Sequence, residues 1–270
     1  MNNQLISPIQ PYFILDAQNS YQKKEINSEG IAHFYCFTLD KEGDAVSVVP
    51  DASIDIIFKL HKDKPEAWAC GSWRKLGKTV FEHGCSYFGI RYQIGIVPSF
   101  LSIKPGDIID QSIPLQDISV LGSFLIDRLS DCQSFEQQIS VFQQICSQKI
   151  DLLDSSKLYH VLIKLMLKHH GNITIPELCH ESGYSARTIS NSFNNYYGFS
   201  PKACNLILRY QHVLDRLMQN DCKRLTDLAI DTGYSDQAHF FRQFKRYNGY
   251  GPREFQNMLN NIAPRLDSCY

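Results

Sequence analysis

Apolar and polar residues alternate in short runs along the first part of the chain, between about residues 31 and 101. The runs are rich in β-branched and aromatic residues and are separated by Gly, Pro or charged residues, which is typical of strands joined by turns. In SIDIIFKL (53–60), Asp55 and Lys59 stand between apolar neighbours, which predicts a strand with one buried face. The predicted strands are residues 31–39, 45–50, 53–60, 67–73, 78–83 and 86–97.

Beyond residue 105 the apolar residues recur with the period of a helix. Residues 120–129, 134–150 and 155–171 have this pattern, and the third segment ends at Gly171, a residue type that commonly terminates helices. We place a domain boundary between residues 151 and 156, because no segment from there to about residue 262 alternates as a strand does. The predicted fold is α+β, with a β-rich N-terminal domain that also contains helices (1–153), an all-α C-terminal domain (154–262) and a short tail (263–270).

Two stretches of the helical region are related to each other and lie about 50 residues apart. The first spans about residues 173–201 and the second about residues 225–256. Gly-Tyr-Ser occurs at 183–185 and again at 233–235, after which the second copy is one residue longer. Repeat arrays usually need three or more units, so two copies favour a paired module.

Each copy has the residues of a helix-turn-helix. Thr-x-x-Glu at 174–177 predicts a capping box at the start of the first helix. Gly183 and Gly233 stand where a left-handed residue ends one helix and begins a tight turn. Ser185 and Ser235 follow as predicted N-caps of the next helix in each copy.

The second helix of the second copy has two different sides. At about 100° per residue, one side is mostly apolar and the other carries cations and small residues. The outward side suits the major groove of DNA, where Arg reads guanine and Lys or Arg holds phosphate; a charged, solvent-facing helix is the alternative. The inward side comprises Asp236, Phe240, Gln243, Phe244 and Tyr247, and the outward side comprises Ala238, Phe241, Arg242 and Lys245, flanked by His239 and Arg246.

Five short segments of the second copy carry a resemblance to a known family: residues 228–229, 233–237, 239–240, 244–245 and 249–252. Together they resemble the C-terminal signature of AraC-type transcriptional regulators. The resemblance implies a DNA-binding domain of two helix-turn-helix units joined by a long helix over about 201–219, which holds two recognition helices for successive major grooves about 34 Å apart. It further implies a promoter-binding regulator, most often an activator, with double-stranded DNA and RNA polymerase as partners and no cofactor.

The resemblance also assigns roles by position. Six residues fall at places that face bases: Ala186, Arg187, Asn191, Gln237, Ala238 and Arg242. Four fall near the DNA backbone: Asn194, Asn195, Lys245 and Arg246. Gly183 and Gly233 are the turn residues. Asn191 stands where the family often has Arg, and because Asn pairs with adenine it implies a half-site that prefers A·T.

Three segments carry a second resemblance: VVPDASIDIIF (48–58), FGIRYQIGIVPSFL (88–101) and PLQDI (114–118). They resemble a poorly characterised domain that precedes the DNA-binding module in one branch of the family, with Ala52–Ser53 where Gly-Cys is usual. This resemblance implies that residues 1–153 sense an effector, form a homodimer or contact polymerase. The helices expected between 120 and 150 pack either with a second subunit or against the sheet.

Aromatic residues are plentiful in the N-terminal region, and they fit either a small-molecule pocket or an ordinary core. The sequence does not identify an effector. His33, His61 and His83 lack H-x-H spacing, so we expect no metal site. The aromatic residues are Phe34, Tyr35, Phe37, Phe58, Trp68, Trp73, Tyr87, Phe88 and Tyr92.

The net charge of −1 hides an asymmetry. Residues 1–157 carry 14 Lys and Arg against 19 Asp and Glu, a net charge of −5, whereas residues 158–262 carry 12 against 8, a net charge of +4. The second region is therefore the one that attracts a polyanion. The N-terminus lacks the pattern of a signal peptide and no apolar run is long enough to span a membrane, which predicts a cytoplasmic, nucleoid-associated bacterial protein.

Nine cysteines are scattered along the chain with no C-x-x-C spacing, so we expect neither a disulfide framework nor a thiolate zinc site. Cys222, beside Lys223 and Arg224, is a candidate redox sensor. No phosphate loop or nucleophile elbow points to an enzyme. Two alternatives to an effector-controlled regulator stay open: a regulator with a redox or alkyl-accepting cysteine, and a ligand-independent regulator controlled by a protein partner.

Overall fold

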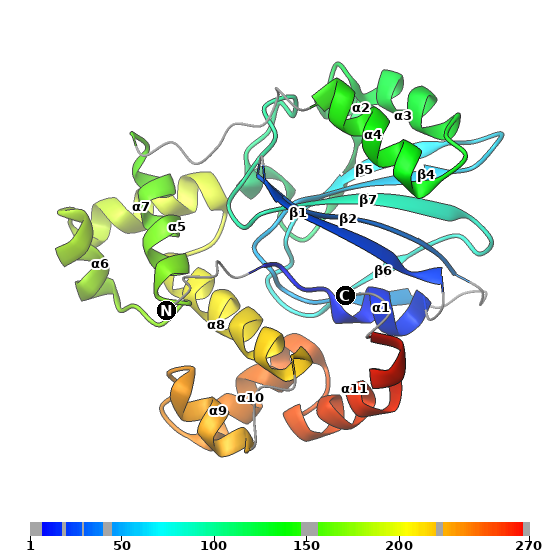
Figure 1. The fold of residues 1–270 in the computed structure, drawn as a ribbon. Coiled ribbons are helices and arrows are strands. Elements are labelled where there is room, and N and C mark those ends of the chain that lie inside the picture. Colours follow the sequence, from blue (N-terminus) through cyan, green and yellow to red (C-terminus); the bar gives the residue numbers. More distant parts are fainter. Residues whose placement is uncertain are drawn as a thin grey trace.

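The protein has a β-rich N-terminal part and an all-helical C-terminal part, which confirms the predicted α+β architecture (Figure 1). This computed structural model describes residues 7–17, 20–28, 30–39, 45–146, 156–219 and 224–266. The boundary placed between residues 151 and 156 and the candidate sensor Cys222 lie outside the described residues. Among the helices that are described, none is both long enough and apolar enough to cross a membrane.

Six antiparallel strands form the central sheet, in the order β1-β2-β7-β4-β5-β8. A two-stranded antiparallel ribbon, β3–β6, shares a hydrophobic core with it. The strands are β1 (Gln22–Ser28), β2 (Ile31–Thr38), β3 (Ala45–Val48), β4 (Asp55–Leu60), β5 (Glu66–Cys70), β6 (Gly77–Val80), β7 (Ser86–Tyr92) and β8 (Ser112–Pro114).

Two of these strands, β1 and β8, lie outside the region in which the sequence predicted strands. The sequence of β1, QKKEINS, is polar and shows no apolar alternation, and β8 has only three residues. Both are edge strands, and each is paired with a single neighbour in the sheet. The strand predicted over 86–97 also ends early, at Tyr92.

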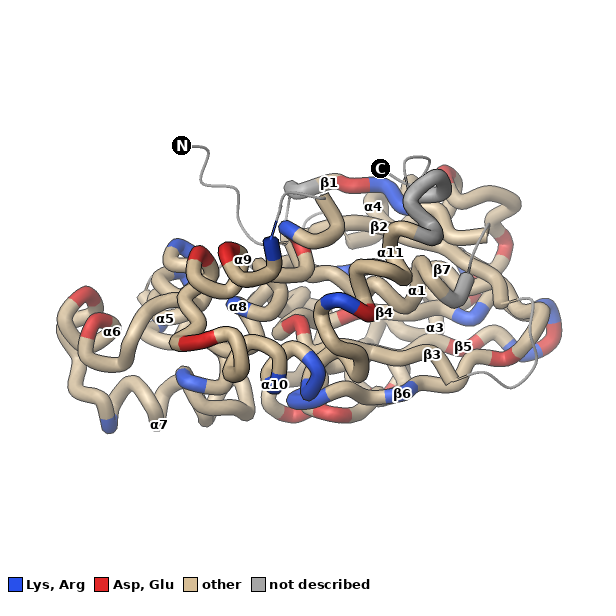
Figure 2. Tube along the Cα trace, turned by 90° about the horizontal axis from the view of Figure 1, so that it is seen from below, with Lys and Arg blue, Asp and Glu red and all other residues tan. Residues whose placement is uncertain are grey.

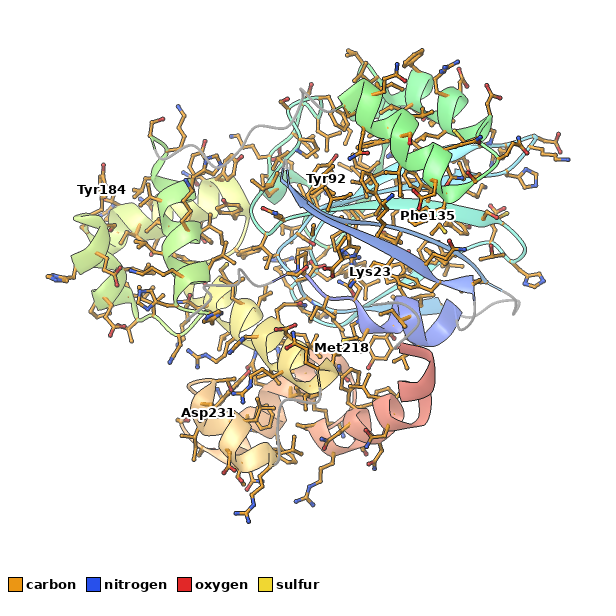
Figure 3. All side chains as sticks on the ribbon, in the orientation of Figure 1. Lys23, Tyr92, Phe135, Tyr184, Met218 and Asp231 are labelled. Carbon is orange, nitrogen blue, oxygen red and sulfur yellow. The ribbon has the colours of Figure 1, made fainter. Side chains whose placement is uncertain are left out.

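Helices cover one face of the sheet (Figure 1). They are α2 (Leu115–Ile118), α3 (Gly122–Ser130) and α4 (Phe135–Cys146). Phe142 of α4 contacts Phe34 of β2 with 5.8 Å between ring centroids, and Phe135, labelled in Figure 3, contacts Phe88 of β7 at 6.1 Å. Of the two arrangements left open for the helices between 120 and 150, the structure shows packing against the sheet.

The opposite face is covered by α1 (Pro11–Ala17) and the β3–β6 ribbon, and this corrects the prediction for residues 53–60. β4 is buried on both faces: Asp55 is 7% exposed and Lys59 is 2% exposed. The charges tolerate burial because each is paired, Asp55 with Arg91 and Lys59 with Glu66 and Glu82. Alternation of charged and apolar residues therefore did not mark a solvent-exposed face.

The C-terminal part contains helices and no strand within residues 156–219 and 224–266. Two helix-turn-helix units, α6–α7 and α9–α10, are joined by the long helix α8, which runs between them in Figure 1. The helices are α5 (Leu158–Lys168), α6 (Ile175–Ser182), α7 (Ala186–Tyr197), α8 (Pro201–Met218), α9 (Leu225–Asp231), α10 (Gln237–Asn248) and α11 (Pro252–Leu266).

Candidate DNA interface

Side-chain caps shape the first helix-turn-helix unit. At α6, Thr174 Oγ1 accepts a hydrogen bond from the Glu177 amide (3.3 Å) while the Glu177 carboxylate accepts one from the Thr174 amide (2.7 Å), so the predicted capping box is present. Ser185 caps α7 by accepting from the Thr188 amide (3.2 Å). Between the two helices, Gly183 has a φ of 76°, a conformation that costs other L-residues roughly 1–2 kcal/mol. Tyr184 projects from this turn at the outer edge of the molecule (Figure 3).

The turn of the second unit closes with a Schellman motif. The Tyr234 amide donates to the Ala229 carbonyl (3.0 Å), and the Gly233 amide donates to the Ile230 carbonyl (3.0 Å). Gly233 has a φ of 80°, which matches the conformation of Gly183 in the first unit. Both turns therefore contain a left-handed glycine, but the following helix begins three residues after Gly183 and four residues after Gly233.

The N-cap of α10 is Asp236 rather than Ser235, the residue that the sequence predicted. Asp236 Oδ1 accepts from the His239 amide at 2.7 Å, and this hydrogen bond lowers the pKa of the Asp236 carboxyl. Ser235 Oγ instead contacts the Asp236 and His239 side chains. The additional residue of the second copy moves the cap by one position. Because a capping residue precedes the helix, Asp236 is exposed and not on the inward side as expected.

α7 and α10, here called the recognition helices, bury matching residues and expose the predicted contact residues. Ile189 and Phe193 of α7 are buried, as are Phe240 and Phe244 of α10. Phe241, expected on the outward side, is half-buried. All ten residues expected at DNA are exposed: Ala186, Arg187, Asn191, Asn194, Asn195, Gln237, Ala238, Arg242, Lys245 and Arg246.

The exposed sides of the recognition helices differ in charge. Each helix has 12 residues, so positions can be matched from the N-cap. Three asparagines of α7 correspond to three cations of α10. We call Asn191, Asn194 and Asn195 the asparagine face, and Arg242, Lys245 and Arg246 the basic face. Figure 2 shows basic segments on α10 and acidic ones on α6 and α9.

Arg209 of α8 links the turn of the second unit to the segment between α5 and α6. Its Nη1 donates to the carbonyl of Gly233 in the second turn (2.8 Å), and its Nη2 donates to the carbonyl of Gly171, just after α5 (3.1 Å). The guanidinium also lies over the Tyr234 ring, 5.4 Å from its centroid. Sequence reasoning missed Arg209, because a single Arg within a long helix belongs to no motif.

Two families match the chain. Residues 178–258, which include both recognition helices, match a family described as a helix-turn-helix domain, and residues 28–114 match a domain of unknown function (DUF6597). The HTH-type transcriptional activator RhaS of Yersinia pestis is 26% identical over 125 residues, 46% of this chain and 45% of RhaS. RhaS of Yersinia pseudotuberculosis is 27% identical over 140 residues, 49% of this chain and 50% of RhaS. The C-terminal domain of this chain is of the AraC type.

The chain spans about half the length of the curated relatives that it matches. Solved structures also align with it, among them these two. A transcriptional regulator with an AraC-type DNA-binding domain from Chromobacterium violaceum has 22% identity and a TM-score of 0.35, over 39% of this chain and 94% of that one. Apo ToxT from Vibrio cholerae has 15% identity and a TM-score of 0.48, over 87% of this chain and 100% of that one.

The N-terminal domain contacts the AraC-type domain at the C-terminal end of each recognition helix. At α10, the Tyr12 hydroxyl lies 2.7 Å from the Asn248 carbonyl oxygen and 2.8 Å from Asn248 Oδ1, and Asn248 Nδ2 donates to the Tyr210 hydroxyl (3.1 Å). Just beyond α7, Gly198 lies against Gly106 of the 3-10 helix η2 (Pro105–Ile108), and a β-carbon on Gly198 would stand 2.7 Å from Gly106 Cα. These contacts leave the asparagine face and the basic face exposed.

The linker helix α8 is also held by the N-terminal domain. Gln211, which is 0% exposed, accepts from the Ile9 amide (2.7 Å) and donates to the carbonyls of Pro50 (2.8 Å) and Ile9 (3.2 Å). Val213 and Leu214 share a core with Tyr12 and other residues of the N-terminal domain. Sequence reasoning missed Gln211, because a polar residue in an amphipathic helix suggests exposure.

A hollow lies in the N-terminal domain beside Ile9 and Pro50, the residues that bond to Gln211. Its empty volume is about 420 Å³, open solvent included. Of the aromatic residues singled out in the sequence, Trp73 lines the hollow, whereas Phe34 and Phe58 belong to the core beneath α3 and α4. The polar residues that line it include Gln10, Asp51, Ser53, Asp55 and Arg91.

A buried ion pair forms one wall of the hollow. Arg91, 3% exposed, donates from Nε to Asp55 Oδ1 (2.8 Å) and from Nη2 to Asp55 Oδ2. The Tyr35 hydroxyl donates to Asp55 Oδ2 (2.9 Å). Asp51 lies further away, with its Oδ2 4.0 Å from Arg91 Nε, and desolvation raises the pKa of its carboxyl. Next to it, Ala52 has a φ of 57°, at the position where the similar domains have Gly.

Four of the five cysteines in residues 1–153 give no support to the alternative of a reactive thiol. Burial raises the pKa of the Cys36 thiol to about 11 and that of Cys70 to about 12. Burial also raises the pKa of Cys85 and Cys132. Since the thiolate is the reactive form, these four residues are poor nucleophiles near neutral pH.

Proposed function

We propose that this chain is a sequence-specific DNA-binding transcription regulator that reads promoter DNA with α7 and α10. One observation supports this above all: two helices of equal length, each preceded by a turn with a left-handed glycine and joined through one linker helix, expose every residue expected at DNA. Arg209 and α8 fix the position of the second unit relative to the segment that leads into the first. A fixed relative position suits recognition of two successive major grooves about 34 Å apart. We infer activation because the RhaS relatives are named as activators.

The exposed residues divide between base reading and backbone binding. In this proposal the base-facing residues are Ala186, Arg187, Asn191, Gln237, Ala238 and Arg242, and the backbone-facing residues are Asn194, Asn195, Lys245 and Arg246. Arg pairs bidentately with guanine and Asn with adenine. The half-site under α10 therefore contains a G·C pair opposite Arg242, and the half-site under α7 prefers A·T opposite Asn191.

The N-terminal domain modulates DNA binding in response to a small molecule held in the hollow. Its contacts with Asn248, with Gly198 and with Gln211 place it against both units and the linker. A ligand that binds two arrangements of these contacts unequally shifts the balance between them. We further propose that the protein contacts RNA polymerase at promoters in the bacterial cytoplasm, and that it can form a homodimer.

Selection of bound fragments from the genome of the source organism tests this function. The full-length chain is expected to enrich promoter fragments that share two short motifs about one helical turn apart. The double variant Asn191→Ala/Arg242→Ala is the matched control, because it keeps both helices and removes one base contact from each. Absence of any enriched fragment at low salt, or equal enrichment by the double variant, contradicts the proposal.

A further inference from the structure

The hollow in the N-terminal domain contains one carboxylate more than it has cations. Among the described residues that line it, Asp51 and Asp55 face a single guanidinium, that of Arg91. Arg91 directs two N–H groups to Asp55 and is therefore largely occupied by it. The hydrogen-bond partners of Asp51 are uncharged: Gln10 Nε2 (2.8 Å) and the Ser53 amide (3.1 Å). The nearest cation to Asp51, Arg91, lies 4.0 Å away and is shared with Asp55, so the charge of this buried carboxylate is incompletely compensated and a cationic ligand is the favoured complement.

Other atoms in the hollow suit the same ligand. Ser53 is 4% exposed, and its Oγ is buried without a hydrogen-bond partner among the described residues, so an N–H donor that reached it would find an unused acceptor. Trp73 lines the hollow with an aromatic ring, whose face attracts an organic cation, whereas the ring of Phe13 already lies under the Arg91 guanidinium, 5.7 Å from its centroid. An anion is disfavoured, because its natural partner, Arg91, is already paired with Asp55.

We propose that this hollow binds a small organic cation of the primary ammonium type, with Asp51 as its counter-charge and Ser53 Oγ as a hydrogen-bond acceptor. We further propose that Gln211 transmits the occupancy of the hollow to the linker helix α8. The second part rests on the proposed function as an effector-controlled DNA-binding regulator, whereas the first part stands on the hollow alone.

Two glutamines connect the hollow to α8 through the same two segments. Gln10 lies on the side of the hollow, where it bonds to the Val49 carbonyl (2.7 Å), the Val49 amide (2.9 Å) and Asp51. Gln211 lies on the side of α8 and bonds to the backbone of the adjacent residues Ile9 and Pro50. In residues 9–10, Ile9 bonds to Gln211 and Gln10 lines the hollow. In residues 50–51, Pro50 bonds to Gln211 and Asp51 lines the hollow.

A ligand at Asp51 acts directly on this arrangement. Asp51 Oδ2, the oxygen that accepts from Gln10, is also the one nearer to Arg91. An ammonium group that takes this oxygen competes with Gln10 and changes how residues 9–10 and 49–51 are held together. Because Gln211 is fully buried and bonds only across this boundary in the described part of the chain, α8 experiences the change.

Thermal unfolding of the full-length protein tests the binding site. The probes are ethylammonium, ethanolammonium and putrescine chlorides, compared with propanol, sodium propionate and sodium chloride at equal ionic strength. At least one amine is expected to raise Tm by about 5 °C at an excess of about 100-fold over its Kd. Asp51→Asn should abolish this shift, and the exposed variant Asp117→Asn should retain it.

The outcomes are decisive in both directions. The binding site is overturned if no amine raises Tm more than sodium chloride does, or if propionate or propanol acts equally well. It is also overturned if Asp51→Asn keeps the full shift. Should Asp51→Asn not fold, Ser53→Ala takes its place: a weaker amine affinity supports the site, and an unchanged affinity overturns it.

DNA binding by Gln211→Met tests the transmission. This variant keeps the side-chain length and removes the hydrogen bonds, and Gln219→Met, at the exposed end of the same helix, is the control. Amine is expected to change the DNA affinity of the wild type and of Gln219→Met, and to leave that of Gln211→Met unchanged while still raising its Tm. An equal amine effect on DNA affinity in all three proteins overturns the transmission. A protein that binds the amine but no DNA overturns the proposed function and the transmission, and leaves the cation site supported.

Discussion

The two helix-turn-helix units have similar backbone features and differ in the charge of their exposed residues. Both turns place a glycine at a φ near 80°, and both recognition helices begin at a side-chain cap and bury Phe at the same position. Yet the first helix presents the asparagine face where the second presents the basic face. Buried and turn residues thus determine the shape of each unit, whereas exposed residues determine what each unit can bind.

The units also differ in how firmly their turns are held. A β-carbon on Gly183 would meet nothing within 4 Å, whereas one on Gly233 would stand 2.3 Å from Asn172 Oδ1. Gly233 additionally accepts a hydrogen bond from Arg209. The second turn is therefore packed against α8 and the first unit, and the first turn faces solvent.

Loss of one base contact from each unit gives the largest expected contrast. Arg242→Ala is expected to weaken binding to a selected promoter fragment by about 1–3 kcal/mol and to relax base preference at one position. Asn191→Ala should relax preference in the other half-site and weaken binding less, because a neutral side chain lacks the attraction of a guanidinium for DNA. Fluorescence anisotropy with point-substituted fragments measures both. Wild-type affinity in Arg242→Ala would show that α10 is oriented differently on DNA.

Alanine at the two turn glycines compares their packing. Gly183→Ala is expected to destabilise the protein by about 1 kcal/mol, from the left-handed backbone alone. Gly233→Ala is expected to cost about 2 kcal/mol or more, because Asn172 must move as well. Urea unfolding monitored by circular dichroism gives both values. Equal destabilisation by the two variants contradicts the difference in packing.

Exchange of backbone-facing residues between the units separates charge from shape. Lys245→Asn together with Arg246→Asn copies Asn194 and Asn195 of the first unit, and should reduce the slope of log K against log salt by about 2. The reciprocal variant, Asn194→Lys with Asn195→Arg, should increase the slope by a similar amount. Titrations at several salt concentrations measure the slopes. A slope that stays constant in both variants would place these residues away from phosphate.

The smallest expected effect concerns the caps, because Asp236 titrates and Ser185 does not. Its hydrogen bond to the His239 amide lowers the pKa of Asp236. A carboxyl whose pKa is lower in the folded state stabilises the fold at pH values above its pKa in the unfolded state, about 3.9. This stabilisation is lost as the pH falls through the pKa of the folded state. Asp236→Ser keeps a cap without the charge, so its stability should fall less than that of the wild type between about pH 5 and pH 3. Identical acid profiles from urea unfolding at each pH would contradict this role.

Local rules explain why sequence reasoning found the C-terminal domain. Caps, turn glycines and helical periodicity each act within a few residues, so Thr174, Gly183 and the buried side of α10 were all recognisable. The error at Ser235 arose from a single additional residue, which moved the cap to Asp236. Such a shift changes which residue caps the helix without changing the fold.

The features that the sequence did not reveal depend on tertiary contacts. Tyr12 and Asn248 are 236 residues apart, and Ile9 and Gln211 are 202 apart, so no local pattern indicates their hydrogen bonds. Strand alternation likewise gave the positions of β2 to β7 but not the burial of both faces of β4. That burial depends on α1 and on the pairing of β3 with β6, which no pattern within β4 itself indicates.

The central claim is that α7 and α10 of one chain enter two successive major grooves. Hydroxyl-radical and guanine-methylation footprinting of the full-length protein on its selected promoter fragment tests this claim most directly. The account predicts two protected segments whose centres are about 10–10.5 base pairs apart on one face of the duplex, with guanine protection that Arg242→Ala removes from one segment only. A single protected segment, or guanine protection that is unchanged in Arg242→Ala, would contradict it.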